Sequence, residues 1–244
     1  MDIKENGFTL IELLIAMGMG LVIMLAIYAS TNISQRSSAA VGRKVATQQD
    51  ARAVLDLMAM EIRMVSFSPT DSSSIWNTIP TCSGAVSNPP CTYCKGIQKA
   101  DADKIHISMD LGGTVVSGAN VPSGTIGDAE NEHILYYYKS DDNSIRRKVG
   151  CSATDEAILG GSEMETLVKN NAENVRLFTY YDRLGNNLAD GITGNVPVAS
   201  IPKIRRIRIT IVADGKNPDI LIGKTRKRLI YSTDVMVKNH VFTP

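Results

Sequence analysis

The sequence lacks a surplus of charge of either sign. Lys and Arg total 26 and Asp and Glu total 25, so the formal charge is +1. This net charge gives no general electrostatic attraction to nucleic acid or acidic lipid. Aromatic residues make up only 5% and the glycine count is ordinary, which excludes fibrous and low-complexity classes. Apolar residues make up 43% of the 244 positions, which is enough for the packed core of one or two domains.

The sequence also lacks the motifs of common enzymes. Gly-x-Ser-x-Gly, P-loop and His-Glu-x-x-His patterns are absent. The three histidines, His106, His133 and His240, lie far apart in the sequence and lack the spacing of metal ligands. Residues 141–143 (Asp-Asp-Asn) could contact Ca²⁺, but three residues in a predicted turn do not define a site. We therefore predict no enzymatic activity, no cofactor and no metal site.

One long stretch near the N-terminus carries no charge. It runs from Leu13 to Gln35, and roughly 20 such residues cross a bilayer as a helix. Glu12 is the one charge in the apolar block, close to its start. The stretch is longer than the apolar run of a secretory signal peptide, about 7–15 residues, and no Ala-x-Ala site directly follows it. We therefore do not expect cleavage after this stretch.

The residues that lead into this stretch form a recognisable motif. Gly7-Phe8-Thr9-Leu10-Ile11-Glu12 before an apolar helix resembles the class III signal of type IV prepilins. The resemblance implies that residues 1–7 are a leader, which prepilin peptidase removes by cleavage between Gly7 and Phe8. Phe8 then becomes the N-methylated first residue and Glu12 the fifth. It also implies that the N-terminus starts on the cytoplasmic side of the inner membrane.

Glu12 is costly in an apolar helix and therefore needs an explanation. A carboxylate costs about 2.5–3.5 kcal/mol at the bilayer centre and less near an interface. After cleavage, the Phe8 amine lies one helical turn from Glu12, about 6 Å along the axis. The two charges could neutralise each other within one chain or between two chains offset along a filament. The resemblance implies the second arrangement, in which Glu12 sets subunit register; the alternative is a glutamate that extends to water.

The helical pattern continues beyond the apolar stretch. From Ser30 to about Ser66, apolar residues recur every three or four positions with charged residues between them, and Pro69 follows. We predict one helix over residues 8–66 that spans the membrane to about residue 33 and is amphipathic beyond it. The alternative is a signal-anchored helix followed by a coiled-coil stalk.

The remaining sequence predicts a loop followed by a sheet. Residues 67–103 are rich in Ser, Thr, Pro and Asn and should form a loop. Residues 104–244 should form a β-rich body, mainly antiparallel, that packs on the amphipathic half of the helix, so the predicted fold class is α+β. The resemblance to type IV prepilins implies that this fold is pilin-like. A short extra helix is expected at 163–172. The predicted strands are 104–109, 134–139, 145–149, 174–182, 204–212 and 229–237.

The four cysteines form an even set: Cys82, Cys91, Cys94 and Cys151. In an oxidising compartment disulfides are the default, and four cysteines allow three pairings. Cys91 and Cys94 lie three apart, so we expect one of them to pair with Cys82 and the other with Cys151. The alternative is a redox or zinc half-site at Cys91-x-x-Cys94, although a second Cys-x-x-Cys is absent.

A second resemblance covers about the last third of the chain. Residues 175–185, 204–212 and 233–239 resemble the PilW-like minor pilins and the J-type minor pseudopilins of type II secretion. This implies a subunit that primes a filament or caps its tip, first with a periplasmic body and later at the cell surface. The implied partners are prepilin peptidase, major and minor pilins, the inner-membrane assembly platform and membrane lipid. The alternatives are a type II secretion pseudopilin, or a single-pass anchored binding module or enzyme that does not polymerise.

Two segments concentrate basic residues. They are Lys224–Arg228 and the set Arg205, Arg206 and Arg208. These side chains could contact DNA phosphates or an acidic neighbouring subunit. We prefer the interpretation of a solvated strand edge protected by charge, so nucleic acid is not a predicted partner, although the sequence leaves it open.

Overall fold

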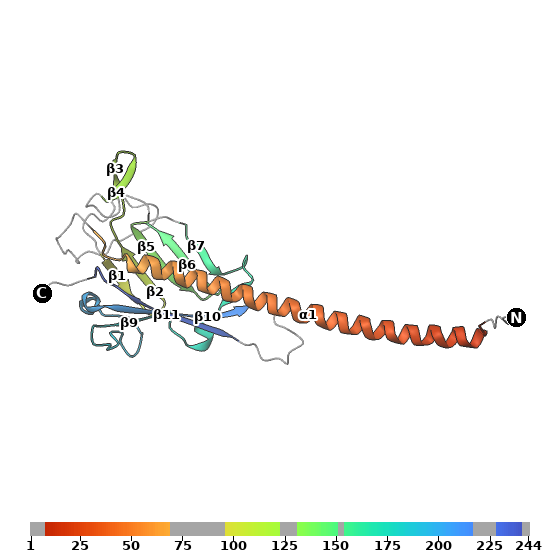
Figure 1. The fold of residues 1–244 in the computed structure, drawn as a ribbon. Helices are drawn as coiled ribbons and strands as arrows, with labels where there is room; N and C mark the ends of the chain where they lie inside the picture. Colours follow the sequence, from red (N-terminus) through yellow and green to blue (C-terminus); the bar gives the residue numbers. More distant parts are fainter. Residues whose placement is uncertain (1–7, 69–95, 123–130, 151–153, 217–227, 241–244) are drawn as a thin grey trace. The chain divides into compact units, whose positions relative to one another are not determined.

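The computed structural model describes residues 8–68, 96–122, 131–150, 154–216 and 228–240. One α-helix, α1, covers Leu10–Arg63 and contains 54 residues (Figure 1). The chain divides into two compact units, Met1–Ala46 and Thr47–Pro244. The first unit contains the N-terminal part of α1, and the second contains the rest of α1 and all the strands.

The larger sheet of the second unit has five antiparallel strands in the order β1-β2-β5-β6-β7. Their bounds are β1 Gly96–Ala100, β2 Lys104–Ser108, β5 His133–Lys139, β6 Ser144–Val149 and β7 Glu156–Gly160. Alternate residues face the core, as in Ile105 and Ile107 of β2 and Ile134 and Tyr136 of β5, which are all buried.

The smaller sheet is built around β10, which pairs with three other strands. The bounds are β8 Thr166–Val168, β9 Phe178–Tyr181, β10 Arg206–Gly215 and β11 Leu229–Met236. Strand β11 pairs along β10, whereas β9 and β8 pair with its beginning and its end. The remaining elements are the hairpin β3 Gly113–Val116 and β4 Ala119–Pro122, and the 3-10 helices η1 Asn171–Glu173 and η2 Val198–Lys203.

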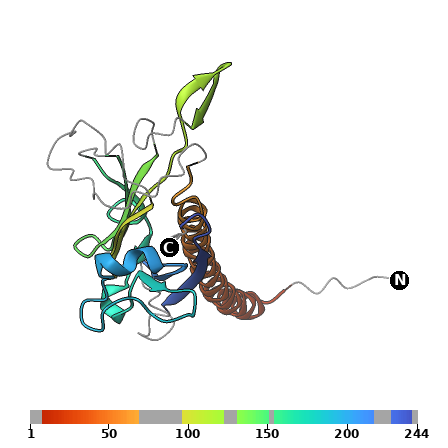
Figure 2. The ribbon, with the colours of Figure 1, turned by 90° about the vertical axis from the view of Figure 1, so that its left-hand side faces the viewer.

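The core of the second unit lies between the C-terminal part of α1 and the sheets (Figure 2). From the helix it receives Ala51, Val54, Leu55, Met58, Ala59 and Ile62. From β10 it receives Ile207, Ile209 and Ile211, which are alternate residues and therefore lie on one face of the strand. The expected α+β class, a long apolar helix packed on antiparallel sheets, is confirmed.

The strands agree with the sequence prediction at six places and differ at others. The six predicted strands correspond to β2, β5, β6, β9, β10 and β11. Strand β1 lies inside the range 67–103, where a loop was expected, because it pairs with β2; residues 69–95 lie outside the described part. The helix expected at 163–172 is wrong. Residues 166–168 pair with the end of β10 as β8, and this tertiary pairing outweighs local propensity.

Candidate assembly site

Two side chains close the N-terminal end of α1. Thr9 precedes the first helical residue, and both its backbone N–H and its hydroxyl donate to Glu12 Oε2 at 2.9 Å. The backbone N–H of Glu12 donates to Thr9 Oγ1 at 3.3 Å. This reciprocal arrangement is a capping box, which satisfies N–H groups that have no partner inside the helix.

The capping box uses only one oxygen of Glu12. Within the described residues, Oε2 accepts both bonds from Thr9, and Oε1 accepts none. A carboxylate oxygen has two lone pairs, so Glu12 can cap its own helix and still receive a cationic donor. Glu12 stands out in the sequence for its charge, and its role in the cap was not predicted, although Thr-x-x-Glu before an apolar run is the signature of a capping box.

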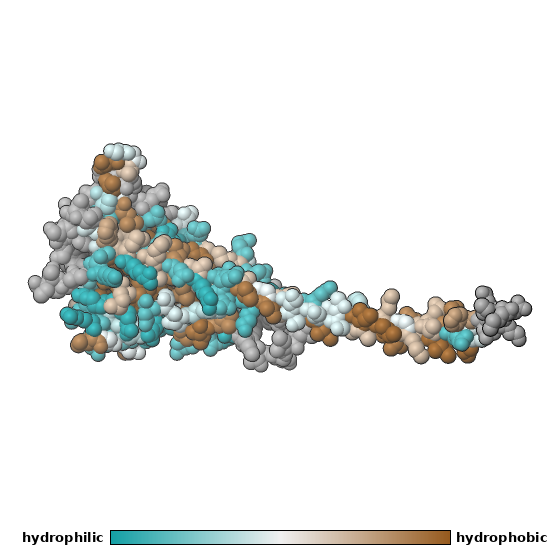
Figure 3. Space-filling model, viewed as in Figure 1, coloured by the Kyte–Doolittle hydropathy of each residue, from teal (hydrophilic) through white to brown (hydrophobic). Residues whose placement is uncertain are grey.

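The N-terminal part of α1 exposes apolar side chains on all sides. Every residue from position 8 to position 31 is exposed. By length and composition α1 could cross a membrane, and none of its most apolar window is buried. Figure 3 shows this apolar surface along the N-terminal part of α1. So large an apolar surface is expected to be covered by lipid or by other helices.

The predicted site residues are divided between described and undescribed parts of the chain. Phe8 and Glu12 are described, and the Phe8 side chain is 90% exposed. Gly7 lies outside the described residues, so cleavage before Phe8 stays a prediction. The cysteines also lie outside them, so their pairing stays a prediction: Cys82, Cys91, Cys94 and Cys151.

In the second unit, a largely buried ion pair fastens α1 to the larger sheet. Glu61 of α1 receives two hydrogen bonds from Arg147 of β6, at 2.8 Å from Nη2 and 3.2 Å from Nε. The Tyr136 hydroxyl of β5 donates to the same carboxylate. Burial, together with this carboxylate, raises the pKa of Tyr136, so the phenol stays protonated. The helix is thus held to the sheet by a specific polar contact as well as by apolar packing.

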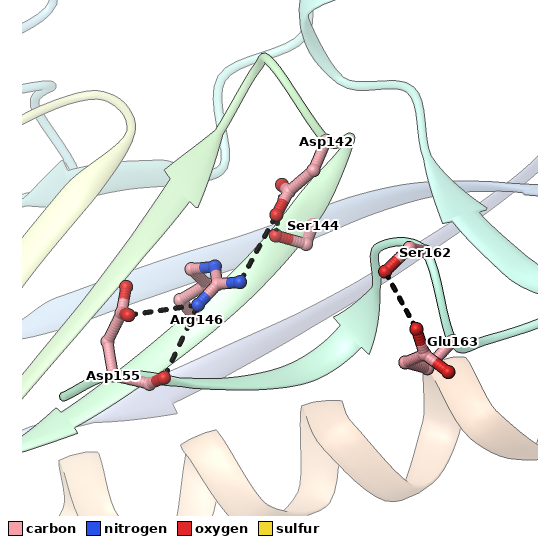
Figure 4. A network of polar contacts seen from close by, with 6 residues as sticks. All are labelled: Asp142, Ser144, Arg146, Asp155, Ser162 and Glu163. Carbon is pink, nitrogen blue, oxygen red and sulfur yellow. Dashed lines mark hydrogen bonds and ion pairs between the residues drawn. The ribbon is translucent and has the colours of Figure 1, made fainter.

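The acidic turn considered for Ca²⁺ is used by the protein itself. Arg146 Nη2 lies 3.2 Å from Asp142 Oδ2, and its Nη1 lies 2.9 Å from Asp155 Oδ1 (Figure 4). Burial raises the pKa of Asp142, but hydrogen bonds from Ser144 and Arg146 outweigh it and hold this pKa below its usual value. Among the described residues, no group of three or more His, Cys, Asp or Glu could hold a metal ion. The contacts of Arg146 join β6 to the turn before it and to the segment that leads into β7.

The structure brings together two histidines that are separated in the sequence. The ring centroids of His106 and His133 lie 6.0 Å apart. His240 lies elsewhere, with its ring nitrogens 3.0 Å from Ser66 Oγ and 3.0 Å from the Ile201 carbonyl oxygen. Burial lowers the pKa of His106 and of His240 to about 4, so both rings are neutral at pH 7.

The basic residues of β10 are paired within the sheet. Arg208 binds Asp234 of β11 through two hydrogen bonds of 2.8 and 3.0 Å, and this carboxylate raises its pKa. The Arg206 guanidinium lies 4.3 Å from the centroid of the Tyr181 ring and 3.5 Å from an Asp234 oxygen. Of the segment 224–228, the structure describes Arg228, which pairs with Glu173.

Comparisons with known proteins give two findings. Residues 3–28 match the family model of the prokaryotic N-terminal methylation motif. The structure is similar to that of a type IV-like pilin, TTHA1219 from Thermus thermophilus, with a TM-score of 0.44 and 12% identity. That similarity covers 80% of this chain and 97% of the other. The comparison with curated proteins finds no match.

Proposed function

We propose that this chain, which is type IV prepilin-like in its N-terminal methylation motif, is a minor pilin that primes a filament or caps its tip. The observation that carries the proposal is this motif, over residues 3–28, at the start of a helix with an exposed apolar surface. The motif supports a pilin or pseudopilin. The assignment as a minor subunit rests on the sequence resemblance of the last third of the chain.

The first step that we propose is maturation. Prepilin peptidase hydrolyses the peptide bond between Gly7 and Phe8, and the new Phe8 amine is methylated. An α-amino group has a pKa near 8, so this amine is mostly cationic at neutral pH. It arises beside Thr9, at the end of α1 where the aligned peptide dipoles of the helix create positive potential. The amine therefore needs an anion, and the carboxylate of Glu12 is one turn away.

The second proposed step is assembly through α1. Glu12 Oε2 remains with Thr9, and Oε1 accepts an N–H from the methylated amine of a neighbouring subunit. An unpaired carboxylate costs about 2.5–3.5 kcal/mol at the centre of a bilayer, so a register that leaves Glu12 unpaired is disfavoured. The apolar helix fits anchoring in the inner membrane before the chain joins other pilins.

Mass spectrometry of the native protein tests the maturation step. We expect the N-terminal peptide to begin with N-methyl-Phe8. A native chain that keeps the residues before Phe8 would remove the pilin assignment. It would favour a single-pass anchored binding module or enzyme. Co-purification with minor pilins from sheared filaments separates a pilus role from a role in type II secretion, where the partners would be secretion pseudopilins.

Two matched variants test the role of the Glu12 charge. Glu12→Gln keeps an acceptor for the capping box but removes the charge, whereas Thr9→Val keeps the charge but removes the capping hydroxyl. We expect both variants to be processed, Glu12→Gln to be missing from sheared filaments, and Thr9→Val to be present. Immunoblots of filament and membrane fractions measure this. Normal incorporation of Glu12→Gln would contradict charge pairing, and equal loss of both variants would assign the effect to the cap.

A further inference from the structure

The ends of three strands of the smaller sheet meet at one edge. Strand β9 ends at Tyr181 and β11 ends at Met236, next to the beginning of β10 at Arg206. A hollow of about 880 Å³ opens there, between the turn after β9 and the segment before β10. Its walls are fixed by backbone hydrogen bonds: Arg205 donates to Tyr181 and Val237 donates to Arg205, both at 2.9 Å.

The hollow is strongly cationic. Four of its eight lining residues are basic: Arg183, Lys203, Arg205 and Arg206. The single acidic residue is Asp182, whose carboxylate is engaged by the turn that follows it. Its Oδ1 accepts two backbone N–H groups at 2.8 Å, and its Oδ2 accepts a side-chain amide at 2.9 Å. This carboxylate therefore holds the turn in shape and does not pair with the four cations.

Two of these cations, Arg183 and Lys203, are available to a ligand, whereas the other two are engaged within the protein. Arg205 Nη1 donates to three backbone carbonyls at 2.8 to 2.9 Å, and Arg206 contacts Asp234 and Tyr181. Arg183 and Lys203 are exposed, and within the described part of the chain neither side chain forms a hydrogen bond or an ion pair. The two paired arginines shape the hollow, and the two exposed cations give it unneutralised charge.

The same hollow also presents apolar side chains. Leu184 is 84% exposed and Met236 is 56% exposed, and both line the hollow. Large apolar side chains at such exposure in a concave site favour a partner that covers them. A ligand that fits must therefore combine negative charge with an apolar group.

We propose that this hollow binds an extended acidic segment of another protein, in which carboxylates flank an aliphatic side chain. The carboxylates pair with Arg183 and Lys203, and the aliphatic side chain is buried against Leu184 and Met236. The surface is concave, which suits a chain segment better than a membrane. The nearby ring of Tyr181 is covered by a guanidinium at 4.3 Å, so it offers no free platform for nucleic-acid bases on that face. The proposal does not depend on polymerisation, because the hollow belongs to the second unit alone.

Binding is tested with the full chain in neutral detergent and a fluorescent peptide of about eight glutamates around two central leucines. We expect saturable binding in fluorescence anisotropy that weakens as salt rises. The charge reversal R183E/K203E should weaken binding about tenfold or more. The control R52E/R63E reverses two exposed cations of α1, changes the net charge equally, and should bind like the wild type. Near-UV circular dichroism verifies folding, and R183Q/K203Q replaces the charge reversal if that variant does not fold.

A second peptide, with serines in place of the leucines, tests the apolar contribution. The unmodified chain should bind it about threefold or more weakly, and L184S/M236S should remove this preference. Three results would overturn the proposal. The first is that R183E/K203E and R52E/R63E weaken binding equally. The second is that the unmodified chain binds both peptides with equal affinity. The third is that a single-stranded DNA oligonucleotide of matched charge binds more tightly than the peptides and that R183E/K203E abolishes this binding. The last result would assign the hollow to nucleic acid.

Discussion

Glu61 and Arg147 form an ion pair that places charge inside the second unit. Their side chains are 9% and 17% exposed, so both charges are largely withdrawn from water. A buried pair contributes little compared with well-packed apolar residues, but removing one partner leaves an uncompensated charge. We predict that Arg147→Met lowers the free energy of unfolding by about 3–5 kcal/mol, measured by urea denaturation of the full chain in detergent.

Two further variants check this interpretation. Arg208→Met breaks a pair with Asp234 whose side chains are 42% and 36% exposed, and it should change stability by about 1 kcal/mol or less. The double variant E61L/R147M removes both buried charges and should recover much of the loss. If Arg147→Met and Arg208→Met proved equally mild, the buried pair would not be what fastens α1 to β6.

His240 gives the molecule a pH dependence. Burial lowers its pKa from 6.5 to about 4 in the folded chain, where the ring lies between Ser66 and Ile201. Between these pH values the unfolded chain binds more protons, so stability is complete above pH 6.5 and falls as the pH decreases toward 4. The fall approaches 1.4 kcal/mol per pH unit for such a group. His106, with a pKa also near 4, adds a similar contribution.

We predict that His240→Gln flattens this dependence between pH 7 and 5, above the usual pKa of carboxylates. Urea denaturation at several pH values measures the slope. The variant is expected to be less stable at pH 7 because it replaces a fitted ring, so the slope and not the absolute stability is the readout. The slope that remains belongs to His106 and His133, whose pKa burial also lowers. An unchanged slope would show that His240 is protonated alike in both states.

At the residue scale, what could be predicted depended on distance along the chain. The capping box lies within four residues, Thr9 to Glu12, so its pattern could be read from the sequence. Glu61 looks like the other charged residues of the helix, yet it is buried because Arg147, 86 residues later, lies opposite it. No local pattern connects these two positions. Such tertiary partners require the folded chain.

At the element scale, the pairing between the end of β7 and the beginning of β6 depends on a glycine. Gly160 has φ +85°, and a Cβ there would lie 2.9 Å from the Ser144 Cα and even closer to the Asn143 carbonyl. Backbone atoms cannot yield as a flexible side chain can. We predict that Gly160→Ala lowers the free energy of unfolding by more than about 2 kcal/mol.

Gly118 supplies the matched control. It has φ +81°, in the turn between β3 and β4, but a Cβ there would meet nothing within 4 Å. Gly118→Ala should therefore show only the cost of the backbone conformation, about 1 kcal/mol. Urea denaturation of both variants compares them. Equal effects would mean that the clash at Gly160 is relieved by a small shift of the β6–β7 hairpin.

The strands differ in how far the sequence revealed them. Strands β10 and β11 are 10 and 8 residues long, and the alternation of β10 is long enough to predict. Strand β8 has three residues, too few to show a period, and it exists because it pairs with residues 213–215. Strand β7 reads Glu-Ala-Ile-Leu-Gly, in which apolar residues are adjacent and no alternation appears. Short or non-alternating strands depend on their neighbours for their definition.

At the scale of the whole molecule, one helix serves two environments. Up to Ala46 it belongs to a unit whose described residues include no buried side chain, and from Thr47 it supplies the core of the second unit. The hydrogen bond from Thr166 to Asp50, at 2.8 Å, fixes the helix to β8 near this boundary. The sequence indicates two parts of this helix, an uncharged stretch from Leu13 to Gln35 and a later part with periodic apolar residues, but neither pattern changes at Ala46. The boundary itself is set by where the sheets begin to cover the helix.

This boundary predicts how the chain responds to truncation. A chain that begins at Gly42 keeps the buried helix residues from Thr47 onward and lacks the apolar stretch. We expect it to stay in solution without detergent and to unfold cooperatively in urea. A chain that begins at Asp56 also loses Val54 and Leu55.

Losing such buried aliphatic side chains costs about 2–5 kcal/mol each, which together approaches the total stability of a typical domain, about 5–15 kcal/mol. The shorter chain should therefore fail to fold, as seen by the loss of near-UV circular dichroism. The chain that begins at Gly42 gives the more demanding test, because it retains every core residue that the structure assigns to the second unit. If it needed detergent or unfolded without cooperativity, the second unit would depend on the apolar part of α1, and the division at Ala46 would be wrong.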